Sequence, residues 1–260
     1  MLQKVEKCVM IYSKKGDAMN FNIEFLNFWH FVIIAFVVLL PVVFTVIFKN
    51  KSEKTKKLFL LIVAIADVVI FVWRIIRISK EAWFNIWDEL PLHLCSIGII
   101  INLIAVVFNS RLMYSFSYCY SSVGAFLAVL IPTVHFIGSP IYHIDNITFY
   151  LQHAMIVSFG ISARSLGFVK FPLKDVFKST ALLFGFAFLA HGANLAIKAL
   201  ELGNPNYMFT VDASINPVLQ MFYNLCPIPF VYLFLLLPIV ALIAFIAYLP
   251  TLIGNLKKKK

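Results

Sequence analysis

Several apolar segments of about twenty residues dominate this sequence and restrict the environment in which it can fold. The first runs from Asn27 to Phe48 without an Asp, Glu, Lys or Arg. A helix of about twenty residues spans the hydrocarbon core of a bilayer, since each residue adds about 1.5 Å. Of the 260 residues, 62% are hydrophobic and 13% are charged, which is typical of an integral membrane protein. The first segment is too long for a signal peptide and lacks a cleavage pattern, so we expect a retained helix.

The apolar segments predict an all-α integral membrane protein, a bundle of about seven transmembrane helices. The predicted spans are 27–48, 58–78, 90–108, 112–131, 147–163, 178–199 and 230–253. Residues 200–229 contain four prolines, so we expect them to fold over the outer mouth of the bundle or partly re-enter it. The predicted organisation is an interfacial N-terminal tail over 1–26, a single transmembrane domain over 27–254 and a basic tail over 255–260.

Basic residues indicate which ends of the helices face the cytoplasm. The net charge is +10, but the lysines cluster between apolar segments, with five in 49–57 and four in 257–260. This pattern is typical of orientation signals beside anionic lipid and not of nucleic-acid binding. Residues 132–146 contain no Lys or Arg. We therefore predict an N-terminus outside and a C-terminus in the cytoplasm, in a multi-pass protein of a bacterial plasma membrane.

Polar side chains gather near the outer ends of the predicted helices. Cys95 and His153 each lie five or six residues past the start of an inward-running span, about 8 Å below the boundary. Ionisable groups at this depth are costly unless they face a cavity or one another. The outward-running helices add four more polar residues to the layer: Arg74, Arg77, His191 and Asn194.

Helical geometry separates the two reactive residues of the third span. Cys95 and Asn102 share a face, whereas His93 is two residues from Cys95 and points about 200° away. We therefore expect the base that activates Cys95 to come from another helix, and His153 matches it in depth. A thiol paired with an imidazole is the nucleophile of acyl-transfer chemistry, because the thiolate attacks. Cys95 and His153 are the predicted catalytic pair, with His93 and Asn102 in support.

The arginines have two possible tasks. Asp67, Arg74 and Arg77 lie on one helical stripe, since a spacing of seven residues is close to two turns. The arginines could pair with Asp67 or Asp88, as in an ordinary buried ion pair, or hold the phosphate of a lipid headgroup. The other cysteines fit packing roles, and the other histidines fit loop or interfacial positions: Cys8, Cys119, Cys226, His30, His135 and His143.

Two other functions remain open from the residues alone. A zinc site could use His93, His153, His191 and Asp88 to activate water. A transporter or solute-binding protein could line a path for an anionic solute with Asp67, Arg74 and Arg77. The acyl-transfer hypothesis needs no metal or other cofactor.

The run Trp87-Asp-Glu-Leu-Pro-Leu-His-Leu-Cys95 resembles the YwaF-like family of integral membrane proteins. Tyr150-Leu-Gln-His153, placed 58 residues after Cys95, and Asn206-Tyr-Met-Phe209 extend the resemblance over most of the chain. Animal relatives of that family include a transmembrane acyltransferase that remodels ether phospholipids. The resemblance implies that Cys95 accepts an acyl chain from a phospholipid as a thioester, with His153 as general base and then acid. A lysophospholipid or water would take the acyl group. Membrane lipid hydrolases that use threonine and histidine are more distantly similar.

Overall fold

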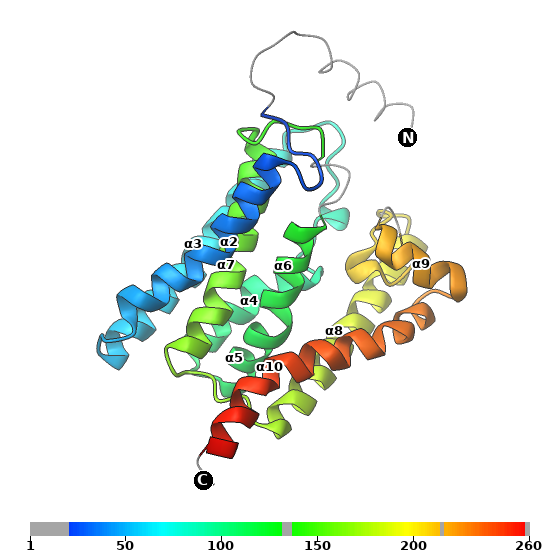
Figure 1. The fold of residues 1–260 in the computed structure, drawn as a ribbon. Helices are drawn as coiled ribbons and strands as arrows, with labels where there is room; N and C mark the ends of the chain where they lie inside the picture. The colour runs from blue at the N-terminus through cyan, green and yellow to red at the C-terminus, as the bar shows by residue number, and fades with distance from the viewer. Residues whose placement is uncertain (1–20, 132–136, 214–215, 258–260) are drawn as a thin grey trace.

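A computed structural model describes residues 21–131, 137–213 and 216–257 (Figure 1). The regular secondary structure of these residues is helical, and within them the only β-type pairing is an isolated antiparallel bridge between Asn22 and Pro140. The long helices are α2 (Phe28–Phe48), α3 (Glu53–Ile78), α4 (Leu94–Val107), α7 (Ile144–Ser165), α8 (Leu173–Ala199) and α10 (Leu237–Lys257). The shorter ones are η1 (Ile86–Asp88), α5 (Arg111–Phe116), η2 (Ser117–Ser121), α6 (Ser122–Leu130), η3 (Tyr207–Phe209), α9 (Pro217–Leu225) and η4 (Val231–Leu236).

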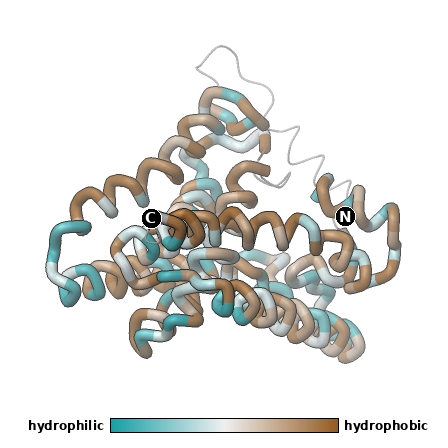
Figure 2. Tube along the Cα trace, turned by 60° about the horizontal axis from the view of Figure 1, so that its bottom comes forward, coloured by the Kyte–Doolittle hydropathy of each residue, from teal (hydrophilic) through white to brown (hydrophobic). Residues whose placement is uncertain are grey.

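Five helical stretches in the described ranges are long and apolar enough to cross a membrane. They are α2, α3, the continuous run from α5 to α6, α8 and the run from η4 into α10. Hydrophobic residues run along these helices, and several of the turns between them are hydrophilic (Figure 2). Large apolar side chains project outward, such as Phe28 at 69% exposure, as expected for a surface that meets lipid. The all-helical membrane class is confirmed, whereas the crossing of about seven helices and the orientation of the termini stay predictions.

Helix α7 lies at the centre of the bundle. It packs against α2, α3, α4, α6 and η2, so its neighbours enclose it on several sides (Figure 1). Its buried side chains include polar ones, such as Asn146, Gln152, His153 and Ser158. A helix shielded by other helices does not need an apolar surface all round, which explains why α7 is too polar to count among the five apolar stretches. Polar groups on α7 therefore face protein.

Two predicted helix starts were wrong because capping residues lie further upstream. Helix α3 begins at Glu53 and not at 58, because the Ser52 hydroxyl accepts a hydrogen bond of 3.2 Å from the Thr55 N–H. Part of the lysine cluster is thus the first turn of the helix. Helix α7 begins at Ile144 and not at 147, because the His143 ring accepts from the Asp145 N–H.

The predicted start of the third span at Leu90 was also wrong, since α4 begins at Leu94. The segment before it is held by tertiary hydrogen bonds instead of helical ones. The Leu90 N–H donates to the Tyr207 hydroxyl at 2.9 Å, and the backbone of His93 is extended. Contacts with residues more than a hundred positions away thus delay the helix by one turn.

The predicted span 112–131 contains a π-helical turn, η2, between α5 and α6. The Ser122 hydroxyl donates to the Ser117 carbonyl oxygen at 2.9 Å inside this turn. Gly160 of α7 packs against the same carbonyl, and a Cβ atom on it would lie 2.7 Å from the Ser117 oxygen. Helix α7 therefore packs directly against the π turn. Such turns are frequent at functional sites.

Residues 200–229 are broken, as predicted, but contain two short helices, η3 and α9. Met208 and Phe209 within η3 both have positive φ angles, of 52° and 56°. Non-glycine residues adopt this conformation at a cost, so surrounding contacts must hold η3 in place. The final span also starts differently, with the 3₁₀ turn η4 before α10. The predicted tails over 1–26 and 255–260 lie mostly outside the described residues.

Candidate functional site

The imidazole of His153 is oriented by its own helix. Its Nδ1 donates to the Phe149 carbonyl oxygen at 2.7 Å, one turn earlier on α7, and the side chain is buried. The Phe149 ring lies 4.0 Å from the imidazole, measured between centroids. Because a carbonyl oxygen can only accept, Nδ1 carries the proton and Nε2 of the neutral ring is left as an acceptor. His153 is thus arranged as a base.

Cys95 lies beside the same stretch of α7. Its half-buried thiol is free and packs on a cluster that includes Tyr150, Ala154 and Val157, which flank His153 along the helix. One turn further along α4, a Cβ atom on Gly98 would be 3.7 Å from the Ile156 side chain. Since α4 and α7 run in the same direction (Figure 1), stepping back three residues on each puts Cys95 level with His153.

We predicted equal depths for Cys95 and His153 by counting residues from the predicted starts of their helices. The structure places the two residues at one level for a different reason. Cys95 is the second residue of α4 and His153 the tenth of α7, so α4 begins deeper in the bundle than α7. Within the described part of the chain, no hydrogen bond joins the thiol to the imidazole. Their assignment as a catalytic pair stays a prediction, now based on packing register.

Arg74 and Arg77 form ion pairs with acids that we did not predict. Arg74 Nη1 lies 2.9 Å from Glu89 Oε2, and Arg77 pairs with Asp145. Asp88 instead accepts a hydrogen bond of 2.8 Å from the Asn204 N–H. Sequence spacing could not identify these pairs, because their partners lie on other segments. The arginines connect the C-terminal end of α3 to the segment before α4 and to the first turn of α7.

Asp67, the third member of the predicted stripe, has a different environment. Its side chain is 1% exposed, and neither carboxyl oxygen has a hydrogen-bond partner in the described chain. Phe71, one turn further along α3, packs on the same apolar cluster as Cys95, and α3 packs against α4. Of the possible partners that we considered for the arginines, Asp67 is not the one that either of them binds. The structure places this buried acid on the part of α3 that packs near the candidate nucleophile.

Asn194 is bound to η3 and not to a cavity. Its amide donates to the Tyr207 carbonyl at 3.1 Å and to the Thr210 hydroxyl at 2.9 Å, and its oxygen accepts from the Tyr207 N–H at 3.0 Å. His191 Nδ1 lies 3.2 Å from the same Thr210 hydroxyl. Both predicted site residues of α8 therefore hold the strained η3 turn in place.

His93 holds the other side of η3. Its Nδ1 accepts a hydrogen bond of 3.3 Å from the Met208 N–H, and its ring meets the Tyr207 ring edge-on. Because Nδ1 accepts this bond, it carries no proton, and the imidazole is neutral. The importance of Tyr207 could have been noticed in the Asn206-Tyr-Met-Phe209 element of the sequence.

Asn102 lies deeper, on the Cys95 side of α4. Its side-chain oxygen accepts a hydrogen bond of 2.6 Å from the Ser117 hydroxyl, which belongs to the π turn. Gly98, between Cys95 and Asn102, packs on Ser121 so closely that a Cβ atom would be 2.9 Å from its hydroxyl. Asn102 therefore fixes α4 against η2 and positions Cys95 indirectly.

The predicted zinc ligands do not converge. His93 and His191 bind different atoms of the η3 region, and Asp88 binds Asn204. Across the three described ranges, no group of three or more His, Cys, Asp and Glu residues is arranged to hold a metal ion. The residues present therefore do not fit a zinc centre.

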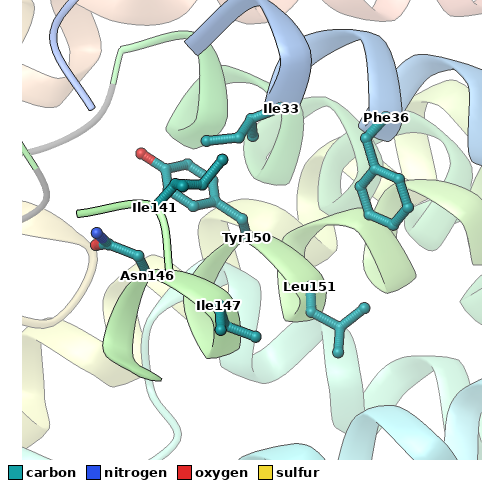
Figure 3. Close-up of a pocket in the computed structure, with 7 residues that line it drawn as sticks. All are labelled: Ile33, Phe36, Ile141, Asn146, Ile147, Tyr150 and Leu151. Carbon is teal, nitrogen blue, oxygen red and sulfur yellow. The ribbon is translucent and has the colours of Figure 1, made fainter. Parts of the chain in front are cut away.

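Two apolar grooves flank the N-terminal half of α7. One, of about 230 Å³, lies between α2 and α7, and Ile141 is among the residues that line it (Figure 3). The other, of about 240 Å³, lies between α3 and α7 and includes Trp73 and Thr148. Ile147 and Leu151 line both, so they form a ridge between two surfaces suited to hydrocarbon chains. Tyr150, one turn from His153, lines the first groove.

Comparison with known proteins gives one family. Residues 25–248 match the model of the TMEM164 family. No curated protein and no solved structure matches the chain.

Proposed function

The chain belongs to the TMEM164 family of transmembrane proteins, and we propose that it acts within the bilayer as a thiol-dependent acyltransferase or lipid hydrolase on phospholipid. The observation that carries this proposal is the position of Cys95, level with a buried imidazole whose Nδ1 donates to a carbonyl, so that Nε2 carries no proton in the neutral ring. The resemblance of the Trp87–Cys95 and Tyr150–His153 segments to the YwaF-like family supports the same reaction. The proposed topology has the N-terminus outside and the C-terminus in the cytoplasm of a plasma membrane.

The proposed reaction divides acyl transfer into two steps. The Cys95 sulfur attacks the ester carbonyl of a phospholipid, and His153 Nε2 takes the thiol proton. A carbon–sulfur bond forms, the carbon–oxygen ester bond breaks, and the same proton passes to the leaving lysophospholipid oxygen. A second lysophospholipid, or water, then attacks the thioester and releases Cys95, with His153 again moving the proton.

The surroundings suit a lipid substrate. The grooves beside α7 are apolar and lie on the part of the helix that precedes His153, where an acyl chain can pack. The polar groups at the outer end are mostly occupied by internal hydrogen bonds and ion pairs, which disfavours a solute path lined by Asp67, Arg74 and Arg77. The residues around Cys95 and His153 are thus better suited to a reaction on a lipid than to the transport of an anionic solute.

Acyl transfer to the protein tests the proposal directly. Purified protein in lipid nanodiscs is incubated with a phospholipid that carries a labelled acyl chain, and hydroxylamine-sensitive label on the protein is measured. We expect a thioester on Cys95 that disappears in Cys95→Ala and persists in Cys119→Ala and Cys226→Ala. His153→Ala should slow labelling by about 10²–10⁴-fold, the usual contribution of a general base. Label that is unchanged in Cys95→Ala would overturn the proposal.

A further inference from the structure

The carboxyl group of Asp67 is the least explained buried group in the structure. It lies in the middle of α3 at 1% exposure, and both oxygens lack hydrogen-bond partners among the described residues. Buried polar groups nearly always have partners, because an unpaired one loses its hydration without compensation. An ionisable residue inside a membrane-spanning helix therefore indicates a function by default.

The basic residues that could have neutralised Asp67 are occupied elsewhere. Arg74 pairs with Glu89 and Arg77 with Asp145, both nearer the outer end of α3. An isolated carboxylate in an apolar interior costs several kcal/mol, so the uncharged acid is the less costly form there. The uncharged acid has one O–H donor. Among the described residues that donor has no acceptor.

Asp67 lies on the part of α3 that packs near Cys95. Val68 and Phe71, its neighbours on α3, pack on the same apolar cluster as Cys95, and α3 packs directly against α4. A donor without a partner among the described residues thus lies near the atom that attacks the substrate, while His153 approaches the same level from α7.

We propose that Asp67, as an uncharged acid, donates a hydrogen bond to the substrate carbonyl oxygen while Cys95 attacks the carbonyl carbon. This inference rests on the proposed acyl transfer and adds a catalytic residue to it. As the sulfur–carbon bond forms, the carbonyl oxygen gains negative charge, and a donor aimed at it stabilises the tetrahedral intermediate. Asp67 keeps its proton throughout, since the thiol proton travels to His153 and then to the leaving oxygen. A carboxylic acid acting as such a donor has precedent in apolar enzyme sites.

Two substitutions distinguish a donor from a base. Asp67→Asn keeps the shape and an N–H donor but cannot accept a proton, whereas Asp67→Ala removes the group. The rate of thioester formation on Cys95 is measured for both in nanodiscs. We expect Asp67→Asn to retain most of the rate and Asp67→Ala to lose about 10²–10³-fold, as for removal of one donor to an oxyanion. Ser179→Ala is the matched control, because it also removes a buried, unpaired hydroxyl and should leave the rate unchanged.

Alkylation of Cys95 by a haloacetamide with a long alkyl chain separates folding from catalysis. This reaction forms no oxyanion, so all three variants should alkylate as the natural protein does. Equal loss of acylation in Asp67→Asn and Asp67→Ala, with alkylation intact, would make Asp67 a proton acceptor and overturn the inference. Full activity of Asp67→Ala would also overturn it. Absence of acylation in the natural protein would instead refute the proposed function.

Discussion

The contact between α7 and the π turn predicts a large effect of a single methyl group at Gly160. In Gly160→Ala, the new Cβ would overlap the Ser122 hydroxyl and lie 2.7 Å from the Ser117 carbonyl oxygen. The hydroxyl can rotate away only by losing its own bond to that carbonyl, and the carbonyl belongs to the backbone. Helix α7 must therefore move away from η2, and His153 must move with it.

The magnitude follows from the cost of overpacking. Inserting a methylene group into a packed core costs about 1–3 kcal/mol of folding free energy. A clash with a backbone carbonyl cannot be relieved by side-chain rotation, so we expect a cost of about 3 kcal/mol. For a chain of this size, each kcal/mol shifts the melting temperature by about 2–4 °C, so Gly160→Ala should lower it by about 6–12 °C. Thermal unfolding of purified protein in one detergent measures this change.

A matched control uses another helix. Gly185 of α8 has no atom within 4 Å of the position of an added Cβ, so Gly185→Ala should stabilise by about 0.5–1 kcal/mol through helix propensity alone. Adding Ser122→Ala to Gly160→Ala should recover only part of the loss, because the Ser117 carbonyl remains. If Gly160→Ala melts at the same temperature as Gly185→Ala, the close packing of α7 on η2 is refuted.

Two further substitutions test the contacts that hold the ends of the bundle. Asn194→Ala leaves the Tyr207 N–H without its acceptor, at about 1–3 kcal/mol, and removes a donor from the Tyr207 carbonyl and from the Thr210 hydroxyl. Residues 200–213 should therefore be more sensitive to protease than in the exposed control Asn224→Ala. Equal cleavage of the two variants would contradict this role. Arg111→Met leaves buried Asp175 without its ion pair of 2.7 Å and should cost about 3 kcal/mol in denaturant unfolding, which a second change, Asp175→Asn, should largely restore. A double variant no more stable than Arg111→Met would show that the unpaired charge is not the cause.

The sequence by itself determined the environment and the main segments. The length of an apolar segment can be compared directly with the thickness of the hydrocarbon core of a bilayer. The start of α2 was therefore predicted to within one residue. The sequence also indicated Cys95, His153 and Asp67 as candidate functional residues, because an ionisable or reactive group within an apolar segment is conspicuous whatever the fold. Capping explains part of the remaining error in helix boundaries, since Ser52 could have been read as a start signal, whereas a histidine cap such as His143 is not an ordinary one.

Only the tertiary structure decided which polar groups meet. Helical periodicity relates residues on one helix, but the partners of Arg74, Arg77 and Asn194 lie on segments whose packing depends on every helix in the bundle. The start of α4 was set by a hydrogen bond from the Leu90 N–H to the Tyr207 hydroxyl and by one from the Met208 N–H to His93, with both partners far along the chain. The same packing leaves both Asp67 oxygens without a hydrogen-bond partner among the described residues. Spacing along one helix allowed an ion pair between Asp67 and an arginine, whereas packing between helices gave the arginines other acids and buried Asp67 apart from them.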